Sequence, residues 1–315
     1  MAHDHEHDQH AHPAAAGDHH DHQHGPTSYG RAFAIGISLN IAIVVIEVIY
    51  GLLSHSMALV ADAGHNTGDV LGLALAWGAT VLAKRTPSTK RTYGLRRMSI
   101  LVALANAVVL LVATGGVGWE AIRRLGDPGT VDARTVMVVA AIAVAINGAS
   151  ALLFIAGSKH DLNIRGAFLH LAGDAAIALG VVASGGVILA TGWTVVDPIV
   201  SLVVSALVLL TTWSVLRRSL DLALDAVPEH IDAEKVRIYL TTLPGVSEVH
   251  DLHIWAMSTT ETALTAHLVS ARSDDPQFLG GVCKELRVKF RIEHATLQIE
   301  PPNGDLCRQA PEGAL

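Results

Sequence analysis

Two segments of this sequence repeat the pattern His-x-x-Gly-Asp inside long apolar stretches. The first runs from His65 to Asp69 and the second from His170 to Asp174. In a helix, residues i and i+4 share one face, with about 5–6 Å between their Cβ atoms. Two such helices facing each other would bring two imidazoles and two carboxylates around one point, a set of ligands that suits tetrahedral Zn²⁺. The repeat therefore predicts a metal site made of His65, Asp69, His170 and Asp174.

Each His–Asp pair could instead be a local interaction within its own helix. On a soluble helix such a pair is worth only about 0.2–0.5 kcal/mol. Within a bilayer, an ionisable side chain is costly unless it is paired or hydrated, so two matching copies favour the metal site. The glycines that precede the two aspartates, Gly68 and Gly173, are expected to let the two helices approach closely.

Other polar residues lie in the same apolar stretches without a clear role as ligands. Asp62, three residues before His65, could orient an imidazole, cap a helix or bridge two helices. Four more are expected to form interhelical hydrogen bonds or to line a hydrated cavity. These are Glu47, Asn40, Asn106 and Asn147. Asp197, followed by a proline, is expected to mark the start of the last apolar helix.

The elements that must position these residues are apolar runs. The chain has 315 residues, of which 50% are hydrophobic and only 16% charged, whereas a soluble domain carries about 25% charged residues. Six runs approach the ~20 apolar residues that cross a bilayer. They are predicted at residues 31–53, 57–83, 98–122, 133–157, 166–190 and 194–216. The sequence thus predicts an all-α membrane domain of six transmembrane helices.

Basic residues flank these runs unevenly. They concentrate in the connection between the second and third runs, in the next connection on the same side, and after the sixth run. The set is Lys84, Arg85, Lys90, Arg91, Arg96, Arg97, Lys159, Arg165, Arg217 and Arg218. Cytoplasmic loops are rich in Lys and Arg, so the bias places both termini in the cytoplasm, although Arg123 and Arg124 oppose it. No signal peptide is recognisable, and we expect a multi-pass protein of the inner (plasma) membrane.

After Arg218 the chain changes character. Asp232 is expected to cap a helix over residues 233–243, which Pro244 and Gly245 end. Further elements are predicted as strands at 246–257 and 261–269, a helix from 275 to about 291, and a strand at 295–300. This αββαβ order predicts a cytoplasmic α+β domain of the ferredoxin-like class, with its helices on one face of a short sheet.

The chain is thereby divided into four parts. They are a disordered His-rich segment at 1–28, the membrane domain at 29–218, the cytoplasmic metal-binding domain at 219–302 and an irregular tail at 303–315. In the first part nine His alternate with Asp and Glu, which we interpret as a weak metal collector, although an expression tag is the alternative. Cys283 and Cys307 fit a reducing environment. The net charge of −7 and the lack of a basic stripe argue against a nucleic-acid partner.

Three segments of the membrane domain resemble the cation diffusion facilitator family, and its zinc-transporting, bacterial cobalt-zinc-cadmium efflux-like type in particular. They read Ser-Met-Ala-Leu-Val-Ala-Asp-Ala-Gly-His at 56–65, Tyr-Gly-Leu-Arg-Arg at 93–97 and Asn-Ile-Arg-Gly-Ala-Phe-Leu-His at 163–170. His-Asp-Leu-His-Ile-Trp at 250–255 is similar to the family's cytoplasmic domain. The resemblance implies a homodimer of six-span subunits that exchanges a divalent cation for protons. It also implies that the two His–Asp pairs form the transport site and that His65 favours Zn²⁺.

The same resemblance implies a second, regulatory metal site at His250, His267 and Glu300. His250 and His267 lie on adjacent predicted strands, so their convergence is plausible. His253 has the opposite strand parity from His250 and is expected to have a structural role. Relatives with a metal site in the tail use a pair of cysteines, whereas this tail has Cys307 alone. The family's extra loop site is also doubtful here, because the loop that contains Tyr93 lacks the required His and Asp.

Together these patterns predict a secondary transporter, not an enzyme, that exports Zn²⁺ from the cytoplasm in exchange for protons by alternating access. Metal ligands must be deprotonated, so proton exchange follows from their chemistry. One alternative is an intramembrane protease built on Asp69 and Asp174, but this leaves His65 and His170 unexplained and the zinc-protease motif is absent. The other is a membrane-anchored metal sensor, for which buried polar ligands in the spans would be unnecessary.

Overall fold

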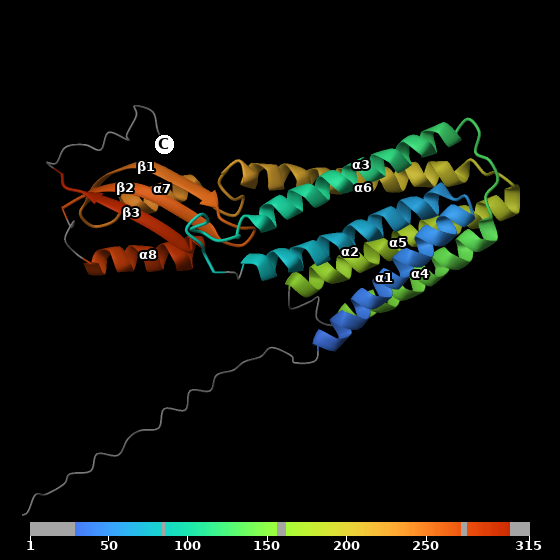
Figure 1. The fold of residues 1–315 in the computed structure, drawn as a ribbon, viewed down its shortest axis with the longest axis horizontal. Helices are drawn as coiled ribbons and strands as arrows, with labels where there is room; N and C mark the ends of the chain where they lie inside the picture. Colours follow the sequence, from blue (N-terminus) through green and yellow to red (C-terminus); the bar gives the residue numbers. More distant parts are fainter. Residues whose placement is uncertain (1–28, 84–85, 156–161, 272–275, 303–315) are drawn as a thin grey trace, which may run out of the picture.

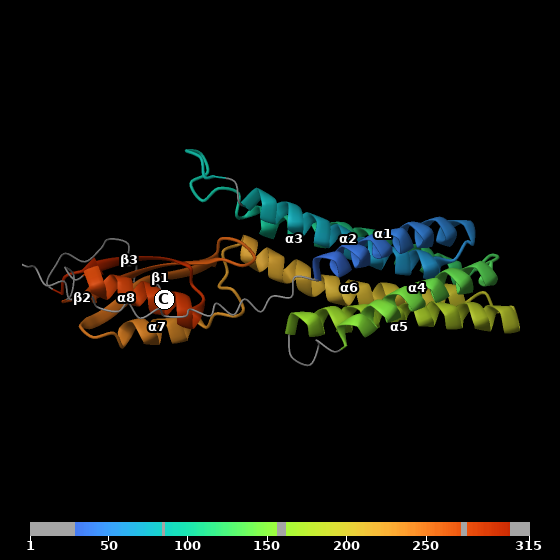
Figure 2. The ribbon, with the colours of Figure 1, turned by 90° about the horizontal axis from the view of Figure 1, so that it is seen from below.

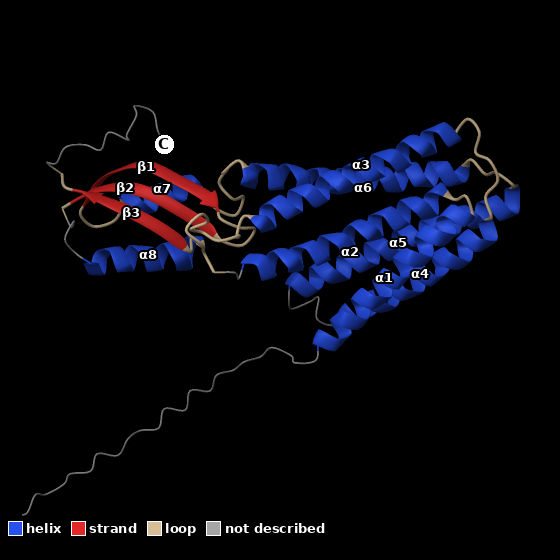
Figure 3. Ribbon diagram, viewed as in Figure 1, coloured by secondary structure: helices blue, strands red, loops and turns tan. Residues whose placement is uncertain are grey.

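The computed structural model describes residues 29–83, 86–155, 162–271 and 276–302. The predictions made for the His-rich segment 1–28, for the tail 303–315 with Cys307, and for Lys84, Arg85 and Lys159 therefore lie outside the described residues. Along the longest axis of the molecule, a bundle of long helices is followed by a region of strands and shorter helices (Figure 1). Colouring by secondary structure separates these two regions clearly (Figure 3).

Six helices occupy the six apolar runs. They are α1 (Tyr29–Leu53), α2 (Met57–Ala83), α3 (Met98–Arg124), α4 (Ala133–Phe154), α5 (Leu162–Thr191) and α6 (Val196–Ala223). The largest departure from the predicted bounds is at the end of α6, which continues past Arg218 instead of ending near residue 216. Polarity does not end a helix, and the segment beyond Arg218 contains Ser, Leu, Asp and Ala, none of which breaks a helix.

The outward face of the bundle is apolar. Among the described residues, four helices are long and apolar enough to cross a membrane, namely α3, α4, the part of α5 from Phe168, and α6. Large apolar side chains point away from the protein, including Val112 at 72% exposure and Leu153 at 77%. Exposed apolar surface of this extent belongs against a partner or lipid. The helical region is therefore a membrane domain.

The helices pack in pairs, α4 along α5 and α3 along α6, with α2 in contact with α1, α3 and α6 (Figure 2). Small side chains allow this close packing. Ala58 and Leu59 of α2, for example, share one buried cluster with Val136 and Ala140 of α4 and Val181 of α5. Direct contact between α2 and α5 extends over a short stretch only.

The short turn between α1 and α2 is held by side chains of two other helices, α6 and α3. At its end Asp197 of α6 accepts hydrogen bonds from the Ser56 hydroxyl and, at 2.6 Å, from the Met57 amide. Asp197 thus satisfies the free N–H groups at the start of α2 from outside that helix. At the same turn, Arg124 donates to the His55 carbonyl at 2.8 Å. The interpretation of Asp197 as a mere helix start therefore missed its main contact, which lies about 140 residues away in sequence.

The expectation for the two glycines is wrong. A Cβ added at Gly68 would meet the Leu110 side chain of α3 at 2.7 Å, so the small residue permits α2 to approach α3 and not α5. A Cβ added at Gly173 would meet nothing within 4 Å. Because Gly and Asp are adjacent in each motif, their side-chain directions differ by about 100° around the helix, as 3.6 residues per turn requires. Each glycine therefore faces a different neighbour from the one that the following aspartate faces.

The strand-containing region follows the predicted order. Its elements are α7 (Ala233–Thr241), β1 (Val246–Ala256), β2 (Thr262–Ser270), α8 (Pro276–Phe290) and β3 (His294–Glu300). The sheet has the order β1-β2-β3, with β1 antiparallel and β3 parallel to β2. Side chains of both helices, such as Val236 and Leu286, share one core with alternate residues of β2, such as Ala266 and Leu268. Residues between them, including His267, face the other side of the sheet.

Contacts across the junction tie this region to the membrane domain. Arg96, at the start of α3, pairs with Glu261 in the β1–β2 turn at 2.8 Å. The Ser99 hydroxyl accepts a hydrogen bond from the Thr259 amide at 3.1 Å in the same turn. Arg97 is paired with Asp225, just beyond α6. The connection between α2 and α3 thus touches the same domain that α6 leads into.

Candidate metal centres

The four side chains of the repeated motif meet between α2 and α5. His65 Nε2 lies 3.3 Å from Asp174 Oδ1 and 3.8 Å from Asp69 Oδ2. His170 Nε2 lies 3.5 Å from Asp69 Oδ2 and 3.6 Å from Asp174 Oδ2. Each imidazole therefore approaches one carboxylate on its own helix and one on the other helix. The structure brings together all four residues that the sequence singled out.

These separations fit a shared ion better than direct hydrogen bonds. Good N–H···O hydrogen bonds are about 2.7–3.2 Å long, and the four contacts are longer, at 3.3 to 3.8 Å. Two ligand atoms that each lie about 2.0–2.1 Å from Zn²⁺ at a tetrahedral angle are about 3.3–3.4 Å apart. Among the described residues, Oδ2 of Asp69 and Oδ2 of Asp174 are buried without a hydrogen-bond donor. The arrangement can therefore hold one small divalent cation.

The four ligands differ in how well they are enclosed. The exposed fractions of the side chains are 2% for Asp174, 16% for His65, 25% for Asp69 and 45% for His170. The ligand atoms of His65, Asp69 and Asp174 all lie within 4.8 Å of one another. His170 approaches both carboxylates at the more open side of this group. One side of the site is thus fixed in the protein and the other is accessible.

A second polar group lies beside this site, between α1 and α2. Asn66 Nδ2 donates to Glu47 Oε2 at 3.0 Å, which is the interhelical hydrogen bond predicted for Glu47. Asn66 itself was not singled out from the sequence. It directly follows His65, so its side chain points about 100° around α2 from that of His65. Asp62 is fully buried, and neither of its oxygens has a hydrogen-bond donor among the described residues. It therefore does not orient an imidazole through a direct hydrogen bond.

The second cluster of ligands lies on the sheet. His250 of β1 pairs in register with His267 of β2, and their ring centroids are 5.3 Å apart. Glu300 of β3 accepts a hydrogen bond from His267 Nδ1, with 2.9 Å between the heavy atoms, and lies 3.5 Å from His250 Nε2. All three side chains are at most 10% exposed. Both ring nitrogens of His250 lack a hydrogen-bond partner among the described residues, so this group too could bind a metal ion.

A fourth side chain, the acidic Asp251, borders this cluster and was missed from the sequence. The β1–β2 register shifts between His250 and His253, and Asp251 adopts a positive φ of 52° within the shift. This bulge turns the Asp251 carboxylate toward His267, with 3.7 Å between Oδ2 and Nε2. Its other oxygen pairs with His253, which is 61% exposed. His253 thus has the structural role expected of it, although a bulge and not simple strand parity sets its direction.

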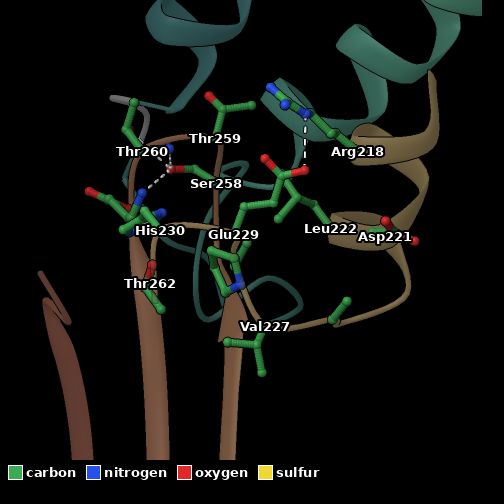
Figure 4. Close-up of a pocket in the computed structure, with 14 residues that line it drawn as sticks. Arg218, Asp221, Leu222, Val227, Glu229, His230, Ser258, Thr259, Thr260 and Thr262 are labelled. Carbon is green, nitrogen blue, oxygen red and sulfur yellow. Dashed lines mark hydrogen bonds and ion pairs between the residues drawn. The ribbon is translucent and has the colours of Figure 1, made fainter. Parts of the chain in front are cut away.

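A hollow of about 230 Å³ lies where α6 leads into the sheet region (Figure 4). Arg218 and Glu229 pair across it at 3.0 Å, and Ser258 accepts hydrogen bonds from the turn beside it. None of the seven proposed metal ligands lines this hollow. Within the part of the chain that the structure describes, the candidate metal ligands therefore lie in the two clusters and not in this hollow.

Both regions of the chain are similar to known proteins. A family profile described as the cation efflux transmembrane domain matches residues 33–222, and one described as the cation efflux protein, cytoplasmic domain matches residues 228–302. The zinc transporter ZitB of Escherichia coli is 36% identical over 280 residues, which cover 87% of this chain and 88% of ZitB. The cadmium, cobalt and zinc/H(+)-K(+) antiporter of Bacillus subtilis is 32% identical over 262 residues, 81% of this chain and 84% of the antiporter.

The metal cation efflux system protein CzcD of Cupriavidus metallidurans is 35% identical over 277 residues, 87% of this chain and 88% of CzcD. A solved structure of the metal-bound C-terminal domain of the same organism's CzcD is 36% identical and covers 22% of this chain and 99% of that domain, with a TM-score of 0.21. The relatives thus extend over both regions of the chain.

Proposed function

The chain belongs to the cation efflux family, and from that premise we propose that it exports Zn²⁺ from the cytoplasm in exchange for protons, by alternating access. Family members and the similar proteins are ion transporters and not enzymes. The intramembrane protease and the membrane-anchored sensor are accordingly disfavoured as alternatives.

The observation that carries this proposal is the group of four ligands between α2 and α5. The two imidazole nitrogens lie 3.3 to 3.8 Å from Oδ2 of Asp69 and from the two oxygens of Asp174, and a tetrahedral ion of about 2.0–2.1 Å bond length accounts for the shorter of these separations. The two carboxylates balance the charge of one divalent cation, and two neutral imidazoles favour Zn²⁺ over harder ions such as Mn²⁺. Relatives named for cadmium and cobalt as well as zinc make a somewhat broader range of substrates plausible.

Exchange for protons follows from the same ligands. Zn²⁺ binds imidazole and carboxylate only in their deprotonated forms, so loading of the metal releases protons and protons displace the metal. The turn between α1 and α2 is closed by contacts with Asp197 and Arg124, whereas His170 is the most exposed of the four ligands. Motion of α5 relative to α2, which touch only over a short stretch, would change both access and affinity.

The same premise extends to the organisation of the chain. We propose six membrane spans within 29–218, both termini in the cytoplasm, a ferredoxin-like cytoplasmic domain at 219–302, and a location in the inner membrane. The family description of the related cytoplasmic domain as a dimer domain supports a homodimer. His250, His267 and Glu300 would form a regulatory metal site there. Residues 1–28 would collect metal, and 303–315 would be an irregular tail.

Flux through reconstituted protein tests the proposed function. The full chain is placed in proteoliposomes that contain a zinc-sensitive dye, and a pH gradient is imposed in either direction. We expect Zn²⁺ movement that reverses when the gradient reverses and that protein-free liposomes do not show. A protein that binds Zn²⁺ but moves none under either gradient would support the sensor alternative, and cleavage of a membrane peptide would support the protease.

A further inference from the structure

A group of buried oxygen atoms lies beside the transport site and is separate from its four ligands. Glu47 of α1 and Asp62 and Asn66 of α2 form this group, and their residues are 0%, 0% and 1% exposed. Asp62 and Asn66 are four residues apart, so they share one face of α2 on successive turns. The hydrogen bond from Asn66 Nδ2 to Glu47 Oε2 at 3.0 Å connects this face with α1. We call these three residues the oxygen group.

Most oxygens of this group accept no hydrogen bond. Among the described residues, Glu47 Oε1, both carboxylate oxygens of Asp62 and Asn66 Oδ1 lack a donor. The two carboxylates also lie close enough for electrostatic repulsion between them, and Asp174 of the transport site adds to it. His65 is the neighbouring group whose charge, when protonated, would attract both. A charged carboxylate in a membrane interior is costly unless it is paired or hydrated.

A bound cation removes that cost, and the donor atoms indicate its class. The unpartnered atoms are all oxygens, with no imidazole nitrogen or thiolate among them. Carboxylate and amide oxygens suit hard cations, whereas Zn²⁺ and its congeners are better served by the nitrogen-containing site next to it. The transport site already neutralises one Zn²⁺ with its own two carboxylates. The negative charge of the oxygen group is therefore not needed to balance the charge of the exported ion.

We propose that Glu47, Asp62 and Asn66 bind a further monovalent counter-cation, either a proton or an alkali metal ion, in addition to the protons that the four ligands exchange for Zn²⁺. This proposal rests on the proposed function, because it adds a second set of atoms to the exchange. Zn²⁺ leaves from the four-ligand site while the counter-cation enters on the carboxylates between α1 and α2. Repulsion between the counter-cation at this site and Zn²⁺ bound nearby would make occupation of the two sites mutually unfavourable, as exchange requires.

The test separates coupling from movement of the metal. Full-length wild-type protein, Asp62→Asn and Glu47→Gln are reconstituted, and two rates are measured for each. One is the exchange of isotopic Zn²⁺ for Zn²⁺ across the membrane with no other gradient, which requires the transport site but no counter-cation. The other is net Zn²⁺ flux driven by a proton gradient with alkali ions absent, and in a parallel arm by a K⁺ gradient at equal pH. Asp127→Asn, an exposed carboxylate in a loop, is the matched control.

We expect Asp62→Asn and Glu47→Gln to lower net flux by roughly tenfold or more, within the usual range of coupling effects, while Zn²⁺/Zn²⁺ exchange stays near the wild-type rate. Asp62→Glu, which restores the charge, should recover coupled flux. The arm in which Asp62→Asn loses flux relative to the wild-type protein identifies the ion as a proton or as K⁺.

Two outcomes would overturn the proposal. Normal net flux from both neutral variants would show that the oxygen group holds no counter-cation. Loss of exchange together with loss of Zn²⁺ binding in Asp62→Asn and Glu47→Gln would make these residues part of the metal site. Neither outcome affects the proposed function itself, which fails only if the wild-type protein moves no Zn²⁺. Asp62→Glu keeps the test decisive if Asp62→Asn does not fold.

Discussion

Two clusters of His and acidic side chains lie in two different regions of the molecule, the helical bundle and the sheet, and they are built on different secondary structure. In the membrane domain the ligands come as i, i+4 pairs from two helices, α2 and α5, with contacts of 3.3 to 3.8 Å. In the cytoplasmic domain they come from three neighbouring strands, and one contact, from His267 to Glu300, is a direct hydrogen bond with 2.9 Å between its heavy atoms. Similar ligands are therefore held by different backbone arrangements.

The difference indicates which cluster can release its ion. A helix forms its backbone hydrogen bonds within itself, so α2 and α5 can move against each other without breaking any of them. Strands are joined by a ladder, and moving His250 relative to His267 would break the pairing of β1 with β2. We infer that the helical cluster suits cyclic binding and release, whereas the strand cluster suits a fixed ion that stabilises or regulates the domain.

The largest expected effect comes from Asp174→Ala. This carboxylate is 2% exposed and approaches both imidazoles, at 3.3 Å from His65 and 3.6 Å from His170. Its removal should abolish Zn²⁺ transport. The expected loss is larger than the roughly 10–100-fold loss that follows when a residue hydrogen-bonded to a metal ligand is removed. Zinc flux in proteoliposomes and the amount of folded protein in the membrane are measured together, with Asp127→Asn as control. If folded Asp174→Ala protein moved Zn²⁺ at the wild-type rate, Asp174 would not be a ligand and the comparison of the two clusters would fail.

His65→Asp should change the ranking of metals and not merely lower the rate. It exchanges a neutral nitrogen ligand for an anionic oxygen, which favours harder and larger ions. We expect residual transport, weaker discrimination for Zn²⁺, and admission of Cd²⁺ or Mn²⁺. Proton competition should move to lower pH, because ordinary imidazole and carboxylate groups titrate near pH ~6.5 and ~3.9. Uptake of the three metals into inverted vesicles across pH measures this. An unchanged metal ranking and pH profile would mean that His65 is not a ligand.

His267→Ala tests the fixed character of the strand cluster. The substitution removes the central ligand, which contacts Glu300 and approaches Asp251. We expect the number of Zn²⁺ ions bound per chain to fall. Maximal flux should change by only about a few-fold, which is the usual effect of one coupled site on another. His230→Ala is the matched control, because this exposed His lies just before α7 and outside both clusters. Complete loss of flux at saturating zinc would contradict the separation of the two clusters.

The smallest effect is expected from Asp232→Ala, at the cap of α7. Asp232 accepts a hydrogen bond from the Lys235 amide at 3.2 Å, and this contact holds the pKa of its carboxyl below the usual range. A lowered pKa contributes stability above the pKa of the unfolded chain, and that contribution is lost as the pH falls through the folded value. The variant should therefore open α7 slightly more often at neutral pH, and this difference should vanish in acid. Hydrogen exchange of the α7 amides measures it, and zinc flux should stay unchanged.

Local patterns were sufficient for most of the fold. Apolar runs of about 20 residues predicted all six helices of the membrane domain. The cap at Asp232, the Pro-Gly stop after α7 and the strands expected at 246–257, 261–269 and 295–300 predicted the order of the second domain. The pairing of His65–Asp69 with His170–Asp174 was also predictable, because i, i+4 spacing in a membrane helix leaves few other uses for such costly side chains. Whether these residues bind the exported ion stays a prediction.

What the sequence by itself determined was therefore which residues share a helix face and which segments are apolar, since both depend on backbone periodicity alone. Only the tertiary structure decided which neighbour each face meets. It placed Gly68 against Leu110 and not against α5, and it brought Asp197 to the start of α2. It also turned Asp251 toward His267 through a bulge. Contacts of this kind depend on helix rotation and strand register, which are set by packing across the whole domain and leave no local pattern in the chain.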